Sequence, residues 1–139
     1  MAKKSQYTWV YSPSKPKPPK LSEPFKGETL RKATEIVETV LKPAFLKPPP
    51  EAPRFNYIVD IYAKWYRHYL YFCSKYAVPG PNAIEPFFEA KQSRLEYVGG
   101  RNFNLAYMRH TGEWIELEQN LTLEECLTRI LPNSHYFVG

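Results

Sequence analysis

Apolar residues recur with helical spacing from about residue 28 to residue 41. This spacing places them on one face of a helix, and they are Leu30, Ala33, Ile36, Val37, Val40 and Leu41. Glu28 complements the positive end of the helix dipole. Pro43 is predicted to limit the helix, because the residue before a proline disfavours the α-helical region. The prolines within residues 47–50 then predict a stiff linker.

From residue 55 onward the pattern changes to β-branched and aromatic residues with two-residue alternation. Residues 56–65 and 68–77 are predicted to form a hairpin that turns near Tyr66 and Arg67. Gly-containing turns are expected at residues 99–102 and 111–112, because Gly and Asn tolerate positive φ. These turns separate three further predicted strands, at residues 87–98, 103–110 and 113–118.

A last helix is predicted after Thr122, whose hydroxyl can cap the helix while Glu125 completes a capping box. Pro132 is expected to end it, after an apolar face made by Leu123, Cys126, Leu127, Ile130 and Leu131. A run of strands between two helices is typical of the α+β class. We therefore expect an antiparallel sheet of about five strands in a meander, flanked by an N-terminal and a C-terminal helix.

Both faces of the predicted hairpin carry aromatic side chains. Alternation divides the first strand into two faces. The expected core face carries Tyr57, Val59, Ile61, Ala63 and Trp65. The opposite face carries Ile58, Asp60, Tyr62, Lys64 and Tyr66. The second strand alternates in the same way, with Tyr69, Tyr71, Cys73 and Lys75 against His68, Leu70, Phe72, Ser74 and Tyr76. One helix layer covers only one face. The other face is expected to meet a second helix, the N-terminal arm, a partner or a ligand.

The 139 residues suit a single domain, and the net charge of +5 is concentrated at the N-terminus. Residues 1–20 hold five lysines and no acidic residue. Their prolines predict an extended polyproline II segment at residues 12–20. We therefore divide the chain into a basic, Pro-rich arm (1–26) and an α+β domain (27–139). The arm's candidate contact residues are Lys3, Lys4, Tyr7, Trp9, Tyr11, Lys15, Lys17 and Lys20.

Histidines and cysteines show no spacing typical of metal or nucleophilic sites. His68, His110 and His135 stand apart from one another and from any cysteine pair. Cys73 and Cys126 are expected to be reduced, buried and unreactive, as in a cytoplasmic protein. No run of 18 apolar residues and no secretory signal is recognisable. We expect no catalytic residue, no metal and no cofactor.

The acidic residues of the predicted strands have structural and functional interpretations. Glu89 and Glu116 could lie on neighbouring strands and form a carboxylate pair. Asp60 is the single aspartate of the chain, and we expect it to form a salt bridge across the sheet to a lysine or arginine. A structural role is the interpretation we favour for Asp60.

The predicted hairpin tip near residue 111 is polar and flanked by an aromatic residue. Arg109 precedes His110 there, and its guanidinium could bind an anion or a phosphate. The structural interpretation, which we favour, is that Thr111 and Gly112 form an ordinary turn while Trp114 belongs to the core.

Several segments of the C-terminal half resemble one known family. They are residues 88–91, 94–97, 103–114, 121–127 and 136–139. They resemble the bacterial domain-of-unknown-function family numbered 3024, which has a strand–turn–strand ending in a tryptophan, a Leu-Glu-Glu helix and an aromatic-glycine terminus. The resemblance covers the C-terminal half only, and it implies a small α+β protein with no established activity.

Together these patterns predict a small non-catalytic interaction module that binds a macromolecule, with a protein as the first expectation. The alternative is single-stranded nucleic acid, with the arm lysines on phosphates and the tyrosines stacked on bases. The candidate partner-binding residues are Tyr62, Lys64, Tyr66, Tyr69, Tyr71, Lys75, Arg109 and His110.

Overall fold

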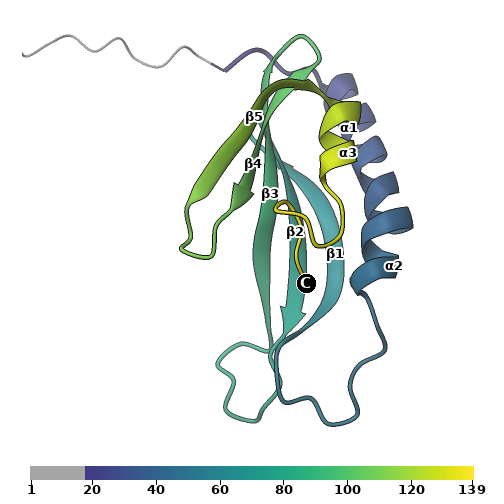
Figure 1. The fold of residues 1–139 in the computed structure, drawn as a ribbon, viewed down its shortest axis with the longest axis vertical. Helices are drawn as coiled ribbons and strands as arrows, with labels where there is room; N and C mark the ends of the chain where they lie inside the picture. Colours follow the sequence, from purple (N-terminus) through teal and green to yellow (C-terminus); the bar gives the residue numbers. More distant parts are fainter. Residues whose placement is uncertain (1–17) are drawn as a thin grey trace, which may run out of the picture.

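The computed structural model describes residues 18–139, which form one antiparallel sheet with its helices on one side (Figure 1). The helical segments are α1 (Glu23–Ile36), η1 (Val37–Leu41), α2 (Lys42–Phe45) and α3 (Leu123–Arg129). The strands are β1 (Tyr57–Tyr66), β2 (Tyr69–Ala77), β3 (Phe87–Gly99), β4 (Asn102–Met108) and β5 (Trp114–Thr122). They pair in the order β1-β2-β3-β4-β5, which confirms the predicted five-stranded meander and the α+β class.

The N-terminal helix begins five residues earlier than the apolar spacing predicts, at Glu23. Ser22 explains the start, because its hydroxyl accepts a 3.3 Å hydrogen bond from the backbone N–H of Phe25. A proline also occupies the first turn, where its missing N–H would have no helical partner. Leu21 and Phe25 pack against the core, so packed structure begins before residue 27, where the domain was predicted to start.

The same helical region continues past Pro43 to Phe45, so the stop predicted at Pro43 is wrong. A π-helical turn, η1, ends two residues before this proline, and the Lys42 N–H donates to the Val37 carbonyl five residues back. In a π turn each backbone N–H bonds to the carbonyl five residues back instead of four. This shift in the hydrogen-bond pattern lets the helix accommodate Pro43, which has no backbone N–H. The linker that follows is confirmed, since residues 46–50 form neither helix nor strand.

A bulge in β1 decides which side chains reach the core. The register with β2 shifts between Ile58 and Asp60, so Ile58 and Ile61 both face the helices although they are three residues apart. The predicted core face of this strand is therefore wrong at its start: Ile58 belongs to the core cluster, whereas Tyr57 and Val59 do not pack against it. From Ile61 to Trp65 the alternation follows the prediction.

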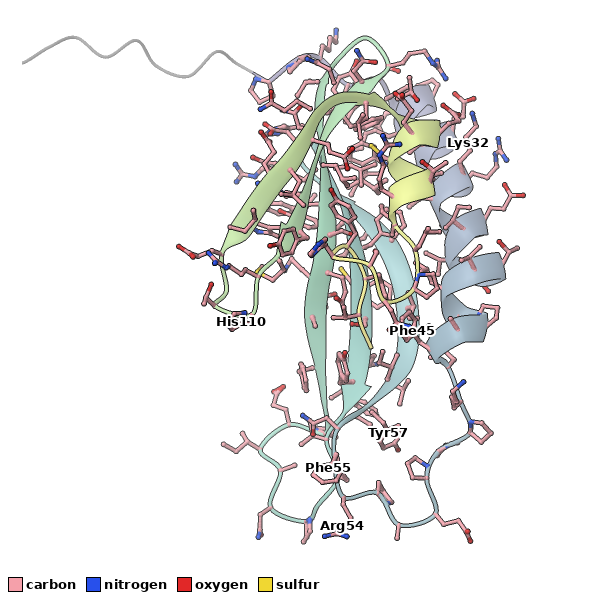
Figure 2. All side chains as sticks on the ribbon, viewed as in Figure 1. Lys32, Phe45, Arg54, Phe55, Tyr57 and His110 are labelled. Carbon is pink, nitrogen blue, oxygen red and sulfur yellow. The ribbon has the colours of Figure 1, made fainter. Side chains whose placement is uncertain are left out.

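The helices α1 and α3 pack on the same face of the sheet and enclose one core. Lys32 of α1 joins the two helices through a 3.1 Å ion pair with Glu124 (Figure 2). The C-terminal residues cover a further part of this face through Tyr136 and Phe137, and the Gln92 amide donates a 2.8 Å hydrogen bond to the Val138 carbonyl. The largest fully buried side chains of the core face include Phe72, Phe103, Phe137, Ile61, Leu70, Leu95, Leu105 and Ile130.

The last two strands differ from their predicted ranges. The strand β4 ends at Met108, so Arg109 and His110 belong to the following turn. The strand β5 continues four residues beyond Glu118 and ends at Thr122. There the predicted capping box is confirmed: Thr122 accepts from the Glu125 N–H, and the Glu125 side chain accepts from the Thr122 N–H.

Candidate binding surface on the uncovered sheet face

Within residues 18–139 no helix covers the sheet face opposite α1 and α3 (Figure 1). Strand register identifies the side chains on this face, which we call the open face. The open face includes Asp60, Tyr62, Lys64 and Tyr66 of β1, Tyr69, Tyr71, Cys73 and Lys75 of β2, Phe87, Glu89, Lys91, Arg94 and Glu96 of β3, Asn104, Ala106 and Met108 of β4, and Trp114 and Glu116 of β5.

Six of the eight residues predicted to contact a partner come together on the open face: Tyr62, Lys64, Tyr66, Tyr69, Tyr71 and Lys75. Arg109 and His110 do not join them. They lie in the β4–β5 turn, where His110 marks the tip of the hairpin (Figure 2). Both border a separate shallow hollow that also includes His135 and Tyr136. The predicted contact set therefore divides between two surfaces.

Only Lys20 of the arm's candidate contact residues is among the described residues, and it is exposed. The described chain passes the β3–β4 turn just before α1, where Pro19 Cγ lies 3.6 Å from the position that a Cβ on Gly99 would take. The predicted contacts of the other arm residues lie outside the described residues, namely Lys3, Lys4, Tyr7, Trp9, Tyr11, Lys15 and Lys17.

An ionic cluster centred on Glu89 occupies the end of the open face near the β2–β3 loop. The Tyr62 hydroxyl donates a hydrogen bond to the Glu89 carboxylate, and Lys64 Nζ lies 2.8 Å from its Oε2. Lys91 Nζ lies 3.6 Å from its Oε1. Desolvation would raise the pKa of Glu89, but the bonds from Lys64 and Tyr62 outweigh it and hold this pKa below its usual range. Glu89 therefore stays ionised, and its one negative charge is shared between the two lysines.

The carboxylate pair considered for Glu89 and Glu116 does not form. Strand β4 separates β3 from β5, and the register partners of Glu89 and Glu116 are Lys75 and Ala106. Asp60 does form a salt bridge, but its partner comes from a helix: Lys42 Nζ of α2 lies 3.5 Å from Asp60 Oδ1.

The middle of the open face holds an arginine between two aromatic rings. The Arg94 guanidinium carbon lies 4.7 Å from the ring centroid of Tyr69 and 4.7 Å from that of Trp114. Trp114 in turn contacts Tyr71, with their ring centroids 5.7 Å apart. The prediction that Trp114 belongs to the core is therefore wrong: it is half-buried, and it packs on the face opposite the helices.

Arg94 is the functional candidate that the sequence analysis missed. Its side chain makes no ion pair and donates no hydrogen bond within residues 18–139, although its Nε is buried. Buried polar groups are normally satisfied, so an orphaned guanidinium nitrogen needs an explanation. Its position could have been inferred from strand pairing, since Arg94 lies directly opposite Tyr71 once β2 and β3 are placed in register.

The charges on the strands of the open face balance. Four cationic side chains, Lys64, Lys75, Lys91 and Arg94, share the face with four acidic ones, Asp60, Glu89, Glu96 and Glu116. Glu96 itself lies 3.4 Å from His68 Nε2. The aromatic rings therefore lie in a surface of alternating charge rather than in a basic patch.

The cysteine thiols lack the surroundings of a nucleophile. Burial raises the pKa of Cys73 to about 11 and that of Cys126 to about 12, so both stay protonated at neutral pH. Both are free and buried, as the sequence predicts. No group of three His, Cys, Asp or Glu side chains within residues 18–139 is arranged to hold a metal ion.

Fold and surface together define a class of small α+β proteins in which helices cover one face of an antiparallel sheet and an aromatic, charge-balanced face is left open. The chain belongs to the family Domain of unknown function (DUF3024), whose model matches residues 21–139. The resemblance thus extends well beyond the C-terminal half and includes the aromatic hairpin. Comparisons with curated proteins and with solved structures give no match. No helix within the described residues is long and apolar enough to cross a membrane.

Proposed function

We propose that this chain is a non-catalytic, cytoplasmic interaction module that binds a protein partner through the open face. The observation that carries the proposal is a set of half-buried aromatic rings on the sheet face that no described helix covers, with Tyr62, Tyr69 and Trp114 among them. Tyrosine, tryptophan and arginine are the residues that dominate binding energy in protein interfaces.

The charge balance of the open face favours a protein over single-stranded nucleic acid. A strand of nucleic acid presents a row of phosphates, and binding it requires an excess of cationic side chains along its path. Lys64 and Lys91 share the single negative charge of Glu89, and the four cationic side chains of the whole face are matched by four acidic ones, so no net positive charge is left for phosphates. A protein surface, with its mixed charges, complements such a face better.

Photo-crosslinking from a defined position tests this proposal. Benzophenone-alanine placed at position 69, in the middle of the open face, is expected to form a covalent adduct with a protein in cells of the host. The matched control carries the same group at Ile84, which is fully exposed in the β2–β3 loop. Adducts that form at position 84 and not at position 69 would refute the proposal.

Nuclease treatment of the crosslinked sample distinguishes a protein partner from a nucleic-acid partner. The adduct at position 69 is expected to survive nuclease treatment and to be digested by protease. A nuclease-sensitive adduct would instead support the nucleic-acid alternative.

Deletion of residues 1–20 tests the arm, which is expected to strengthen binding through its five lysines without being needed for folding. Loss of the cooperative unfolding transition after this deletion would contradict the division into arm and domain.

A further inference from the structure

We infer that Arg94 is the anion-accepting centre of the open face and that the partner places a carboxylate side chain of an acidic protein segment on it. This inference deepens the proposed function and rests on it. It assigns a specific chemistry to one position of the surface, whereas the proposed function requires only that the surface be an interface.

The geometry prepares the guanidinium for a ligand. Tyr69 comes from β2 and Trp114 from β5, and the two rings hold the Arg94 guanidinium between them at equal distances of 4.7 Å. Stacking on ring faces fixes the plane of a guanidinium but leaves its in-plane N–H donors unused. A donor fork that is already oriented loses little conformational entropy when it binds.

The unused donors point to an anion. Two of the other cationic side chains on the strands of the open face, Lys64 and Lys91, form ion pairs with Glu89. Lys75 has an aromatic contact only, with its Nζ 4.6 Å from the ring centroid of Phe87. Neither Lys75 nor Arg94 meets a carboxylate within the described residues, but of these cations only Arg94 has a buried nitrogen, its Nε, that lacks an acceptor. A guanidinium pairs with a carboxylate through two parallel hydrogen bonds. Because Nε is shielded, the terminal nitrogens of this half-buried side chain are the donors that would make them.

The surroundings select a single carboxylate on a protein over a phosphate chain. Glu96 and Glu116 lie on the same face as Arg94. Glu96 follows Arg94 by two residues in β3, and Glu116 of β5 pairs with Ala106 of β4, which itself pairs with Arg94. Two acidic side chains on either side of one cation oppose a row of phosphates but leave room for one isolated negative charge. The rings of Tyr69, Tyr71 and Trp114 offer apolar contacts to the residues that flank it.

A pair of peptides that differ only in charge tests the inference. The full chain, labelled with ¹⁵N, is titrated with Ac-Phe-Glu-Phe-NH₂ and with the isosteric Ac-Phe-Gln-Phe-NH₂. The glutamate peptide is expected to shift the Arg94 Nε–H and the Trp114 indole N–H resonances and to bind about tenfold more tightly than the glutamine peptide. Equal affinity for the two peptides would overturn the inference.

Variants distinguish a specific role of the Arg94 guanidinium from the general effect of a positive charge on this face. Arg94→Gln is expected to abolish the tenfold preference, and Arg94→Lys to retain only part of it, because an ammonium lacks the planar fork. Lys91→Gln removes the same charge from the same strand at a position already paired with Glu89, and the preference is expected to persist. If Lys91→Gln reduces the preference as much as Arg94→Gln does, Arg94 has no special role and the inference fails. Retained dispersion of the amide spectrum shows that each variant is folded.

Two further outcomes distinguish this inference from the proposed function. If the single-stranded oligonucleotide dT10 binds the full chain more tightly than the glutamate peptide, and Arg94→Gln abolishes that binding, both proposals are wrong. If the protein adduct at position 69 still forms in Arg94→Gln, and the unsubstituted chain binds the two peptides equally, the open face remains an interface and only the role of Arg94 is refuted.

Discussion

The indole nitrogen of Trp65 donates a 3.0 Å hydrogen bond to the backbone carbonyl of Lys26, and this bond ties β1 to the first turns of α1. Lys26 also places its Nζ 5.8 Å from the Trp65 ring centroid. Trp65→Phe keeps an aromatic ring but removes the donor. We expect this change to lower the free energy of unfolding by about 1 kcal/mol in urea titrations. An unchanged midpoint would show that the bond contributes nothing to stability.

The capping box of α3 gives a second stability prediction. Thr122→Ala removes the hydroxyl that accepts from the Glu125 N–H at 3.2 Å, and we expect a loss of about 1 kcal/mol in thermal or urea unfolding. Thr111→Ala is the matched control, since Thr111 is an exposed turn residue whose hydroxyl donates only to the side chain of Glu113. Equal losses in the two variants would argue against a capping contribution.

The two faces of β2 are expected to respond differently to truncation. Phe72 is fully buried beneath the helices, whereas Tyr69 is half-buried on the open face. Phe72→Ala should lower the free energy of unfolding by about 3–5 kcal/mol, because it leaves a cavity. Tyr69→Ala should lower it by about 1 kcal/mol, for the lost contact with Arg94. A cost for Tyr69→Ala as large as that for Phe72→Ala would mean that the open face is covered within the folded chain.

Alkaline pH is expected to destabilise the fold through its thiols. The pKa of Cys126 rises from 9.0 to about 12 on folding, and that of Cys73 rises from 9.0 to about 11. Above pH 9 the unfolded chain therefore loses protons that the folded chain keeps, so the free energy of unfolding falls as pH rises from 9 toward these values. Burial shifts the pKa of Tyr62 and Tyr136 upward as well, and this adds to the loss above pH 10.

Urea titrations at pH 8 and pH 10.5 measure this effect, and we expect a loss of at least about 1 kcal/mol between them. The same comparison for Cys126→Ala should show a smaller loss, since that variant lacks the thiol with the larger shift. At pH 8 a thiol reagent should label Cys73 and Cys126 only as fast as the native protein opens. Rapid labelling of the folded protein would contradict the burial of both thiols.

Local patterns along the chain determined most of the fold. The alternation of residues 56–77, the glycines of the two later turns and the Thr122–Glu125 box each act over a few residues, and each appears in the structure close to its predicted place. The stop at Pro43 failed for a physical reason. A proline forbids one hydrogen bond, but a π turn before it changes which carbonyls need partners, and packing of Val37 and Leu41 in the core favours that turn.

Tertiary structure decided which face of the sheet is left open and which strands contribute to the candidate site. Strand alternation placed six of the predicted contacts on one face, but it could not say that both helices cover the other face, because helix placement depends on packing between distant segments. Arg94, Tyr69 and Trp114 come from three strands and meet only when β2, β3, β4 and β5 lie in register. The position of Arg109 and His110 away from that face likewise follows from β4 ending at Met108, because its pairing with β5 closes there at Trp114.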